Sequence, residues 1–531
     1  MSATTMKKAT SMNRLLPLVM TAVALLLTAA AQGAAPGITG PTFNLTAQAA
    51  SISQPDGQAV YSWGYGCRVA PSGFAPATIT NATCGTMQVP GPTLIVTEGQ
   101  TVTVNLTNGL PTATGNTSIL FPGFNVTSTG GAQGLLTKEA VPGGTVTYTF
   151  TAGSPGTRAY YSGTQGDLQV EMGLYGAIIV LPLTVPTACT TGLAASNLTA
   201  ERTWGERDFR LSKAAYGNAR TCYDREYLFQ FSEMDPNIHT QALAQVTAVG
   251  ACTAGAVGCS LSVPTEPYHP AYFMINGRSM PDDMDGNYAA QYPHQPYNGN
   301  PHMHPGEQVL LRIIGQGRWQ HPFHEHGNHV RILGRDGNLI LSAASTAAAP
   351  ALAGPLLFTT TTTPGLAMDG IFYWTGRGLN WDAYGHNPAS GDPLAKLSCT
   401  PDANGYNTGA PTAINYYEWC QDHNKPLQAA PFGDVAAGGP VTLPDANLFT
   451  NGAWYGGSPY LGPNATVRAT GPTGTTPPSG TIANSPTGEA GFAFMWHSHN
   501  EREITTNNIF PGGMMMMMLV DSREFVIDES N

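Results

Sequence analysis

Residues 321–329 read HPFHEHGNH, and residues 496–499 read WHSH. Each stretch contains a pair of histidines two positions apart. In a β-strand, residues two apart point to the same side of the sheet, so each pair is predicted to present two imidazoles on one face. Two such pairs on adjacent strands would offer four nitrogen donors, which suit copper, zinc, nickel or iron. The four histidines are His324, His326, His497 and His499.

The alternative is that these four histidines lie at the edge of the core and that hydrogen bonds pair their ring nitrogens. The chain has only 13 histidines in 531 residues, so two such pairs are an unusual concentration. None of the 13 precedes His239, and the first part of the chain therefore offers no imidazole to a metal. We favour a metal site.

The rest of the chain favours an all-β fold. Charged residues make up 11% of it, while glycine (62) and proline (42) are abundant, which suits many strands joined by turns. Residues 101–106 (TVTVNL) and 145–150 (TVTYTF) alternate polar and apolar side chains, as half-buried strands do. We predict tandem cupredoxin-like Greek-key β-sandwiches with long loop insertions in the second domain.

The expected organisation is a signal peptide at 1–31, a first domain at 40–183, a connector at 184–225 and a second domain at 226–525. A loop-rich insertion is expected at about 342–489, where Ala/Thr-rich and Thr/Pro/Gly-rich segments predict exposed loops. The N-terminus has basic residues, an apolar run at 15–28 and an Ala29-Ala30-Ala31 cleavage site. A membrane anchor is the alternative, but the apolar run is short for one.

The signal predicts a secreted protein, periplasmic or extracellular, with no transmembrane segment after signal removal. The net charge of −11 argues against nucleic acid as a partner. Eight cysteines in a secreted chain suggest disulfides, although sequence does not determine their connectivity. Pairing between sequence neighbours is our hypothesis: 67–84, 189–222, 252–259 and 399–420.

Five sets of motifs together resemble the multicopper oxidase family over nearly the whole mature chain. The most specific is 321–327 (HPFHEHG), with 333–337 (LGRDG) after it. The others are 89–94 (VPGPTL) before Glu98-Gly99, 172–177 (MGLYGA), 273–278 (FMINGR), and 496–499 (WHSH) with Gly513-Met514.

The resemblance implies copper as the cofactor, in one type 1 site that takes electrons from the substrate and one three-copper cluster that reduces dioxygen. By position, His324, His326, His497 and His499 match cluster ligands. His321 matches a type 1 ligand, and Met514 matches the axial methionine of that site.

The departures from the family pattern concern both copper sites. Ser498 stands where the family has the type 1 cysteine, and a hydroxyl cannot form the copper–thiolate bond of a blue site. The second type 1 histidine is replaced by Glu503, or by Ile509 if one counts back from Gly513. The first-domain His-x-His motifs correspond to 120–123 (LFPG) and 161–165 (YSGTQ), which hold no histidine.

These departures exclude an ordinary laccase mechanism. We expect a metal-dependent oxidoreductase with a reduced copper site that acts on a small molecule or a metal ion. The alternative is a non-catalytic copper-binding or structural protein of the envelope or extracellular space. Two-domain relatives share their cluster between subunits of a trimer, so the resemblance also implies a homotrimer.

Three further patterns have a functional and a plainer interpretation. The run Met514 to Met518 is expected to pack in the core, with Met514 as the one candidate ligand. The residues His302-Met303-His304 are expected on a solvated loop, with a second metal site as the alternative. Glu501 and Glu503 are expected to be solvated, with hydrogen bonding to ligand imidazoles as the alternative.

Overall fold

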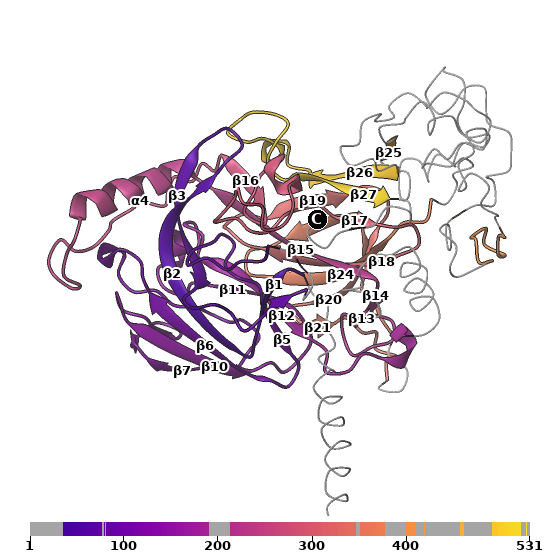
Figure 1. Cartoon of the computed structure of the whole chain (residues 1–531), viewed down its shortest axis with the longest axis horizontal. Helices are drawn as coiled ribbons and strands as arrows, with labels where there is room; N and C mark the ends of the chain where they lie inside the picture. Colours follow the sequence, from indigo (N-terminus) through magenta and orange to yellow (C-terminus); the bar gives the residue numbers. More distant parts are fainter. Residues whose placement is uncertain are drawn as a thin grey trace, which may run out of the picture.

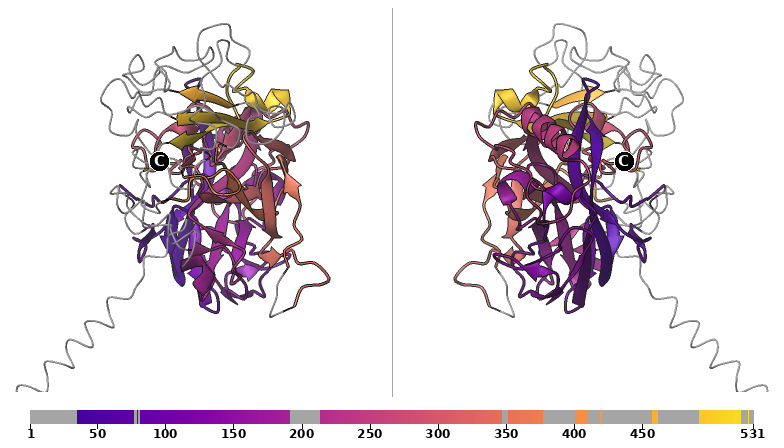
Figure 2. Two further views of the ribbon diagram at one scale, coloured as in Figure 1. Left: turned by 90° about the vertical axis from the view of Figure 1, so that its right-hand side faces the viewer. Right: turned by 90° about the vertical axis from the view of Figure 1, so that its left-hand side faces the viewer.

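The computed structural model describes residues 35–76, 79, 81–190, 213–346, 351–376, 400–409, 419, 457–460, 491–521 and 527. The signal peptide, Cys399, Cys420 and most of the expected insertion lie outside these residues. The described chain is mostly β, as expected (Figure 1). Its first half forms sheets that pack beside those of the second half, and the C-terminal strands lie at one end of the molecule (Figure 2).

Two five-stranded sheets make up the first half, in the orders β11-β12-β5-β1-β4 and β3-β2-β6-β10-β7. The strands are β1 (Gly37–Thr39), β2 (Thr42–Ser53), β3 (Ala59–Cys67), β4 (Phe74–Ala75), β5 (Leu94–Thr97), β6 (Thr101–Asn108), β7 (Thr127–Gly130), β10 (Thr145–Thr151), β11 (Gly156–Tyr161) and β12 (Tyr175–Leu181). A small hairpin joins β8 (Ala132–Gln133) to β9 (Lys138–Glu139), and two short helices are η1 (Thr112–Thr114) and α2 (Gly166–Gln169).

The alternating residues of β6 and β10 explain why these strands form one wall of a sandwich. Val102, Val104 and Leu106 are buried in a core cluster with Val146 and Tyr148. The threonines between them point outward and are exposed or half-buried. The predicted alternation is thus confirmed for both strands.

A seven-stranded and a six-stranded sheet make up the second half. The first has the order β16-β15-β18-β24-β20-β21, with β22 paired to β20. The second has the order β17-β27-β26-β19-β23, with β25 paired to β26. The strands are β15 (Arg225–Met234), β16 (Tyr272–Ile275), β17 (His302–Met303), β18 (Gln308–Gly315), β19 (His321–Glu325), β20 (Val330–Arg335), β21 (Asn338–Leu339), β22 (Leu356–Leu357), β23 (Thr359–Thr362), β24 (Ala367–Tyr373), β25 (Gly457–Tyr460), β26 (Gly491–Ser498) and β27 (Met515–Asp521).

The loop-rich character expected from about residue 342 is wrong for the start of that range. β23 pairs with β19, and β24 lies between β18 and β20 in the seven-stranded sheet. Met368 and Phe372 of β24 belong to the core cluster of the second half. The Thr-rich composition of this region led us to predict exposed loops, but the apolar residues of β24 are buried against strands far away in sequence.

The helix α4 (Pro236–Val249) is an element that the all-β prediction did not include. Asp235 caps its N-terminus by accepting a hydrogen bond from Asn237 N, Pro236 is its first residue, and Gly250 follows its end. These are ordinary helix start and stop signals. The helix packs against β3 (Figure 1).

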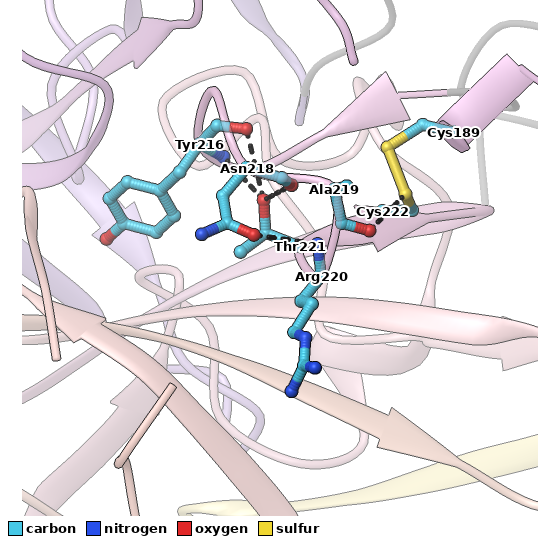
Figure 3. Close-up of a disulfide and its surroundings, with 7 residues drawn as sticks. All are labelled: Cys189, Tyr216, Asn218, Ala219, Arg220, Thr221 and Cys222. Carbon is cyan, nitrogen blue, oxygen red and sulfur yellow. Dashed lines mark hydrogen bonds between the residues drawn. A yellow bond between two sulfur atoms is a disulfide. The ribbon is translucent and has the colours of Figure 1, made fainter. Parts of the chain in front are cut away.

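Three disulfides join described cysteines, Cys67–Cys84, Cys189–Cys222 and Cys252–Cys259, and confirm three of the four expected pairs. The second of them crosslinks the connector, from η2 (Thr187–Thr190) to β14 (Cys222–Tyr223), which pairs with β13 (Lys213–Ala214) (Figure 3). Disulfides of this kind persist in oxidising compartments. In the described residues no helix has the length and apolar character needed to cross a membrane.

The connector turn beside this disulfide carries Tyr216 into the junction between the two halves. Thr221 Oγ1 donates to the carbonyl of Asn218 and closes the turn (Figure 3). Tyr216 Oη then donates to Asp369 Oδ2 on β24 over 2.6 Å. Asp369 also accepts hydrogen bonds from Thr157 of β11 and from Arg312 of β18, and all of these side chains are buried. One carboxylate thus joins the connector, the first half and the second half.

Candidate metal centre

Adjacent strands bring the two histidine pairs together. β19 and β26 are antiparallel neighbours, and their register places His324 directly opposite His497. β23 flanks β19 on its other side, and β27 flanks β26. Two motifs that lie far apart in the chain are therefore side by side in one sheet.

The four imidazole rings pack against one another beside the paired strands β19 and β26. Ring centroids are 4.7 Å apart for His324 and His499, 4.9 Å for His324 and His326, and 5.1 Å for His326 and His497. The centroids of His497 and His499 are 5.0 Å apart. The expected convergence is thus found. We call these four residues the histidine cluster; their role as metal ligands stays a prediction.

Neighbouring oxygen atoms set how two of the rings are turned. His324 Nδ1 lies 2.9 Å from Thr359 Oγ1 on β23. His497 Nδ1 lies 2.8 Å from the carbonyl oxygen of Ser498, which can only accept, so the proton of that ring is on Nδ1. His497 Nε2 is left facing His326 Nε2, 3.2 Å away. Oxygen contacts to the outer ring nitrogen are typical of metal-ligating histidines.

Burial keeps the rings of His324 and His497 neutral. Burial, together with the charges of the other three cluster histidines, lowers the pKa of His324 to about 3. Burial also lowers the pKa of His497. A metal binds only deprotonated imidazole nitrogens, so both rings are in the required state at neutral pH.

The separation of two of the nitrogens fits a shared metal ion. Two metal–nitrogen bonds of about 2.0 Å at a tetrahedral angle place their nitrogens about 3.3 Å apart. The 3.2 Å between His326 Nε2 and His497 Nε2 matches this, although an N–H···N hydrogen bond has the same length. Among the described residues, no three His, Cys, Asp or Glu side chains are already arranged to hold a metal. The cluster rings must therefore turn for three or more of them to share one ion.

The cluster opens toward solvent on one side. His324, His326 and His497 are buried, whereas His499 is exposed. Phe358, which is 48% exposed, lies edge-on to both His324 and His329.

The first half of the chain supplies apolar groups where the family has histidines. Leu120 and Tyr161 form a β-bridge that joins the two equivalent segments. A Cβ atom on Gly163 would lie 2.7 Å from Leu120 Cγ, so Leu120 fills the space beside that glycine. The two segments meet, as the resemblance implies, but with no imidazole.

A different arrangement occupies the positions that match the type 1 site. His321 is fully buried; its Nε2 lies 2.9 Å from Glu233 Oε2 on β15, and its Nδ1 lies 3.0 Å from Glu503 Oε2. Glu503 belongs to η6 (Glu501–Ile504). Ser498 Oγ donates to the same Glu503 Oε2 over 2.5 Å. We call Glu233, His321, Glu503 and Ser498 the carboxylate–imidazole chain.

The pKa of His321 reflects two opposing effects. Burial alone would lower it, but hydrogen bonds and charge from Glu233 and Glu503 outweigh burial and raise the pKa to about 9. The ring is therefore an imidazolium at neutral pH, with its Nε2–H donating to Glu233 and its Nδ1 in an ion pair with Glu503 over 3.0 Å. Because neither nitrogen is left for a metal, we do not include His321 in the proposed ligand set.

Met514 is also left out of that set, because it is fully buried and packs in the core cluster with Met516 and Met518. The core interpretation of the methionine run is confirmed for these alternate residues. The expectation that Glu503 is solvated is wrong, since its side chain is fully buried. Sequence reasoning did not find Glu233, although a glutamate in the otherwise apolar stretch YLFQFSEM was a usable signal.

The motif His302-Met303-His304 does not lie on a solvated loop, as we had expected. Its residues are buried, and the first two form β17, which pairs with β27. His302 Nδ1 lies 2.7 Å from Asp521 Oδ2, and His304 Nδ1 lies 3.2 Å from Glu307 Oε1. Paired carboxylates make burial of these polar rings acceptable. The sequence of the motif is polar, but its tertiary neighbours decide its environment.

Comparison with known proteins finds a similarity over part of the chain. Residues 74–184 match the family model described as multicopper oxidase. An L-ascorbate oxidase of Brassica rapa subsp. pekinensis is 40% identical over 96 residues, which are 18% of this chain and 16% of that protein. Laccase abr2 of Aspergillus fumigatus is 36% identical over 98 residues, again 18% and 16%. The matched segments thus span about one sixth of these relatives.

Solved structures resemble the whole chain more loosely. A blue copper oxidase from Nitrosomonas europaea has a TM-score of 0.42 and 16% identity, covering 90% of this chain and 85% of that one. The multicopper oxidase mgLAC has a TM-score of 0.43 and 15% identity, covering 92% and 87%. The segment that matches the family model, residues 74–184, is multicopper oxidase-like, and proteins of that family normally bind copper.

Proposed function

We propose that this chain is a secreted, copper-binding oxidoreductase of the multicopper oxidase type, with a reduced copper site and no type 1 copper. His324, His326, His497 and His499 would hold the metal. The single observation that carries the proposal is the convergence of these four imidazoles, with His326 Nε2 and His497 Nε2 3.2 Å apart. A bound copper ion would supply one-electron chemistry toward a small molecule or a metal ion.

The residues of this chain have distinct tasks in the proposal. Thr359 and the Ser498 carbonyl hold the outer nitrogens of His324 and His497, so that the inner nitrogens face the cluster. Burial keeps these rings neutral and limits the access of water. The exposed side near His499 and Phe358 would admit the substrate.

A non-catalytic copper-binding protein is the second candidate, favoured by one observation. Both nitrogens of His321 are occupied by carboxylates, so the position where the family takes up electrons holds no metal ligand. Without an entry site, copper would be bound and not turned over. We further propose the domain limits 40–183 and 226–525, an oxidising compartment and a homotrimer.

The test is metal analysis and oxygen consumption on the wild type and on His497→Ala. Copper near one ion per chain, with oxygen uptake lost in the variant, supports the oxidoreductase. Copper in the wild type that is lost in the variant, without oxygen uptake in either, supports the binding protein. A wild type that takes up no copper from solution overturns both.

A further inference from the structure

The carboxylate–imidazole chain crosslinks four elements that are far apart in sequence. Glu233 comes from β15, His321 from β19, Ser498 from β26 and Glu503 from η6. All four side chains are at most 1% exposed. Successive contacts are 2.9, 3.0 and 2.5 Å long. A single metal ion crosslinks elements in the same way, and here a protonated ring between two carboxylates occupies that position.

The remaining carboxylate oxygens of the carboxylate–imidazole chain also accept hydrogen bonds. Glu233 Oε1 accepts from the backbone N–H groups of Arg318 and Trp319, at 2.7 and 2.9 Å, and from Tyr268 Oη. Glu503 Oε1 accepts from Asn500 Nδ2 at 2.9 Å. Buried charges are tolerated when they are paired and hydrogen-bonded, and partly satisfied networks are costly. In the carboxylate–imidazole chain, every side-chain polar atom except His321 Nδ1 therefore has a hydrogen-bond partner, and His321 Nδ1 makes an ion pair with Glu503.

Ser498 connects this arrangement to the histidine cluster. It stands between His497 and His499, and each of its polar groups is engaged. Its N–H donates to the Met514 carbonyl at 3.0 Å, and its carbonyl accepts from His497 Nδ1 at 2.8 Å. Its hydroxyl donates to Glu503 and accepts from Asn500 N at 3.1 Å. Fixing Ser498 therefore fixes the ring of His497.

His321 makes a second connection from the neighbouring strand. The residue after it, Pro322, accepts a hydrogen bond from His499 N at 2.9 Å. Since His321 is held on both sides by carboxylates, the start of β19 has a defined position relative to β26. The backbone of His499 is thereby aligned with β19, where His324 lies.

We propose that Glu233, His321, Glu503 and Ser498 are positioning residues that set the orientation of His497 and His499, in the role that a bound metal ion would otherwise have at this place. The part of this inference that concerns metal binding by the histidine cluster rests on the proposed function. The orientation of the rings in the metal-free protein can be measured directly and does not depend on the proposed function.

The test compares Glu503→Gln and Ser498→Ala with Glu501→Gln. Glu501 lies on the same η6, is exposed, and loses the same charge, so it is the matched control. The first measurement is the ring ¹⁵N spectrum of the metal-free protein labelled at histidine, which reports the tautomer of His497. The second is the Cu(II) dissociation constant with the electron paramagnetic resonance spectrum of the loaded protein.

We expect Glu503→Gln and Ser498→Ala to shift or broaden the His497 ring signals and to weaken Cu(II) binding about tenfold or more, as loss of residues behind a ligand does. Glu501→Gln removes a charge near His497 but no contact of the carboxylate–imidazole chain, so it should change both readouts less than either variant does. If both folded variants keep the wild-type ring signals and Cu(II) affinity, the positioning proposal is wrong. If the wild type binds no Cu(II), the proposed function fails, and the ring spectra alone decide the positioning proposal.

Discussion

Ser498 Oγ donates a 2.5 Å hydrogen bond to Glu503 Oε2. The resemblance to multicopper oxidases implies that Ser498 stands at the type 1 cysteine position and that Glu503 or Ile509 stands at a type 1 histidine position. The hydroxyl offers no thiolate, and the carboxylate oxygen is already shared with His321. The contact between Ser498 and Glu503 explains how β26 and η6 are held together without a metal ion between them.

The first prediction follows directly from this pair. Protein loaded with Cu(II) should lack the intense visible band of a copper–thiolate site, because Ser498 supplies no sulfur. An absorption spectrum of the protein with one equivalent of Cu(II) is the measurement. A strong blue colour would contradict the absence of a type 1 site.

The second prediction concerns Thr359, which contacts His324 Nδ1. Thr359→Val should weaken Cu(II) binding by about tenfold, since ligand histidines lose affinity when the partner of the outer nitrogen is removed. Isothermal titration calorimetry measures the change. Thr361→Val on the same strand is the control, because Thr361 is exposed. Equal affinities for the two variants would show that Thr359 does not orient the ring.

The third prediction is a pH dependence of stability. The pKa of His321 is raised to about 9, against about 6.5 for an unfolded chain. Its stabilising contribution is therefore fully present below about pH 6.5 and is lost as the pH rises through about 9. The free energy of unfolding should fall by about 1 to 3 kcal/mol over this interval.

Urea unfolding of the wild type and of His321→Gln, from pH 6 to 10, measures this difference. The two proteins should differ most at pH 6 and converge near pH 10. A constant difference across the range would mean that the ring is not protonated in the folded protein. Glu233 and Glu503 are the two carboxylates that face the ring.

The fourth prediction concerns the junction of the two halves. Asp369→Asn should lower the free energy of unfolding by about 3 kcal/mol, because it leaves the buried Arg312 with one carboxylate partner fewer. Tyr216→Phe should cost about 1 kcal/mol, the usual value of one hydrogen bond. Tyr373→Phe on the same β24 is the control, since Tyr373 is 49% exposed. Urea unfolding that shows equal midpoints for Tyr216→Phe and Tyr373→Phe would contradict the role of Tyr216.

Much of the fold was readable from local patterns. The alternation in residues 101–106 and 145–150 predicts half-buried strands because a strand shows its side chains to two faces in turn. The spacing of the cysteines was enough to suggest the three pairs that the structure describes. The start of the expected insertion was misjudged, because burial of β24 depends on β18 and β20 and not on its own composition.

By itself the sequence determined the all-β class, the grouping of four histidines in two pairs, and the loss of the thiolate at Ser498. Those facts depend only on residue types and on the two-residue period of a strand. Only the tertiary structure decided that His324 faces His497, that Glu503 is buried against His321, and that Glu233 completes the arrangement. The physical reason is that a buried charge is defined by its partners, and Glu233 lies 88 residues away from His321 in the chain.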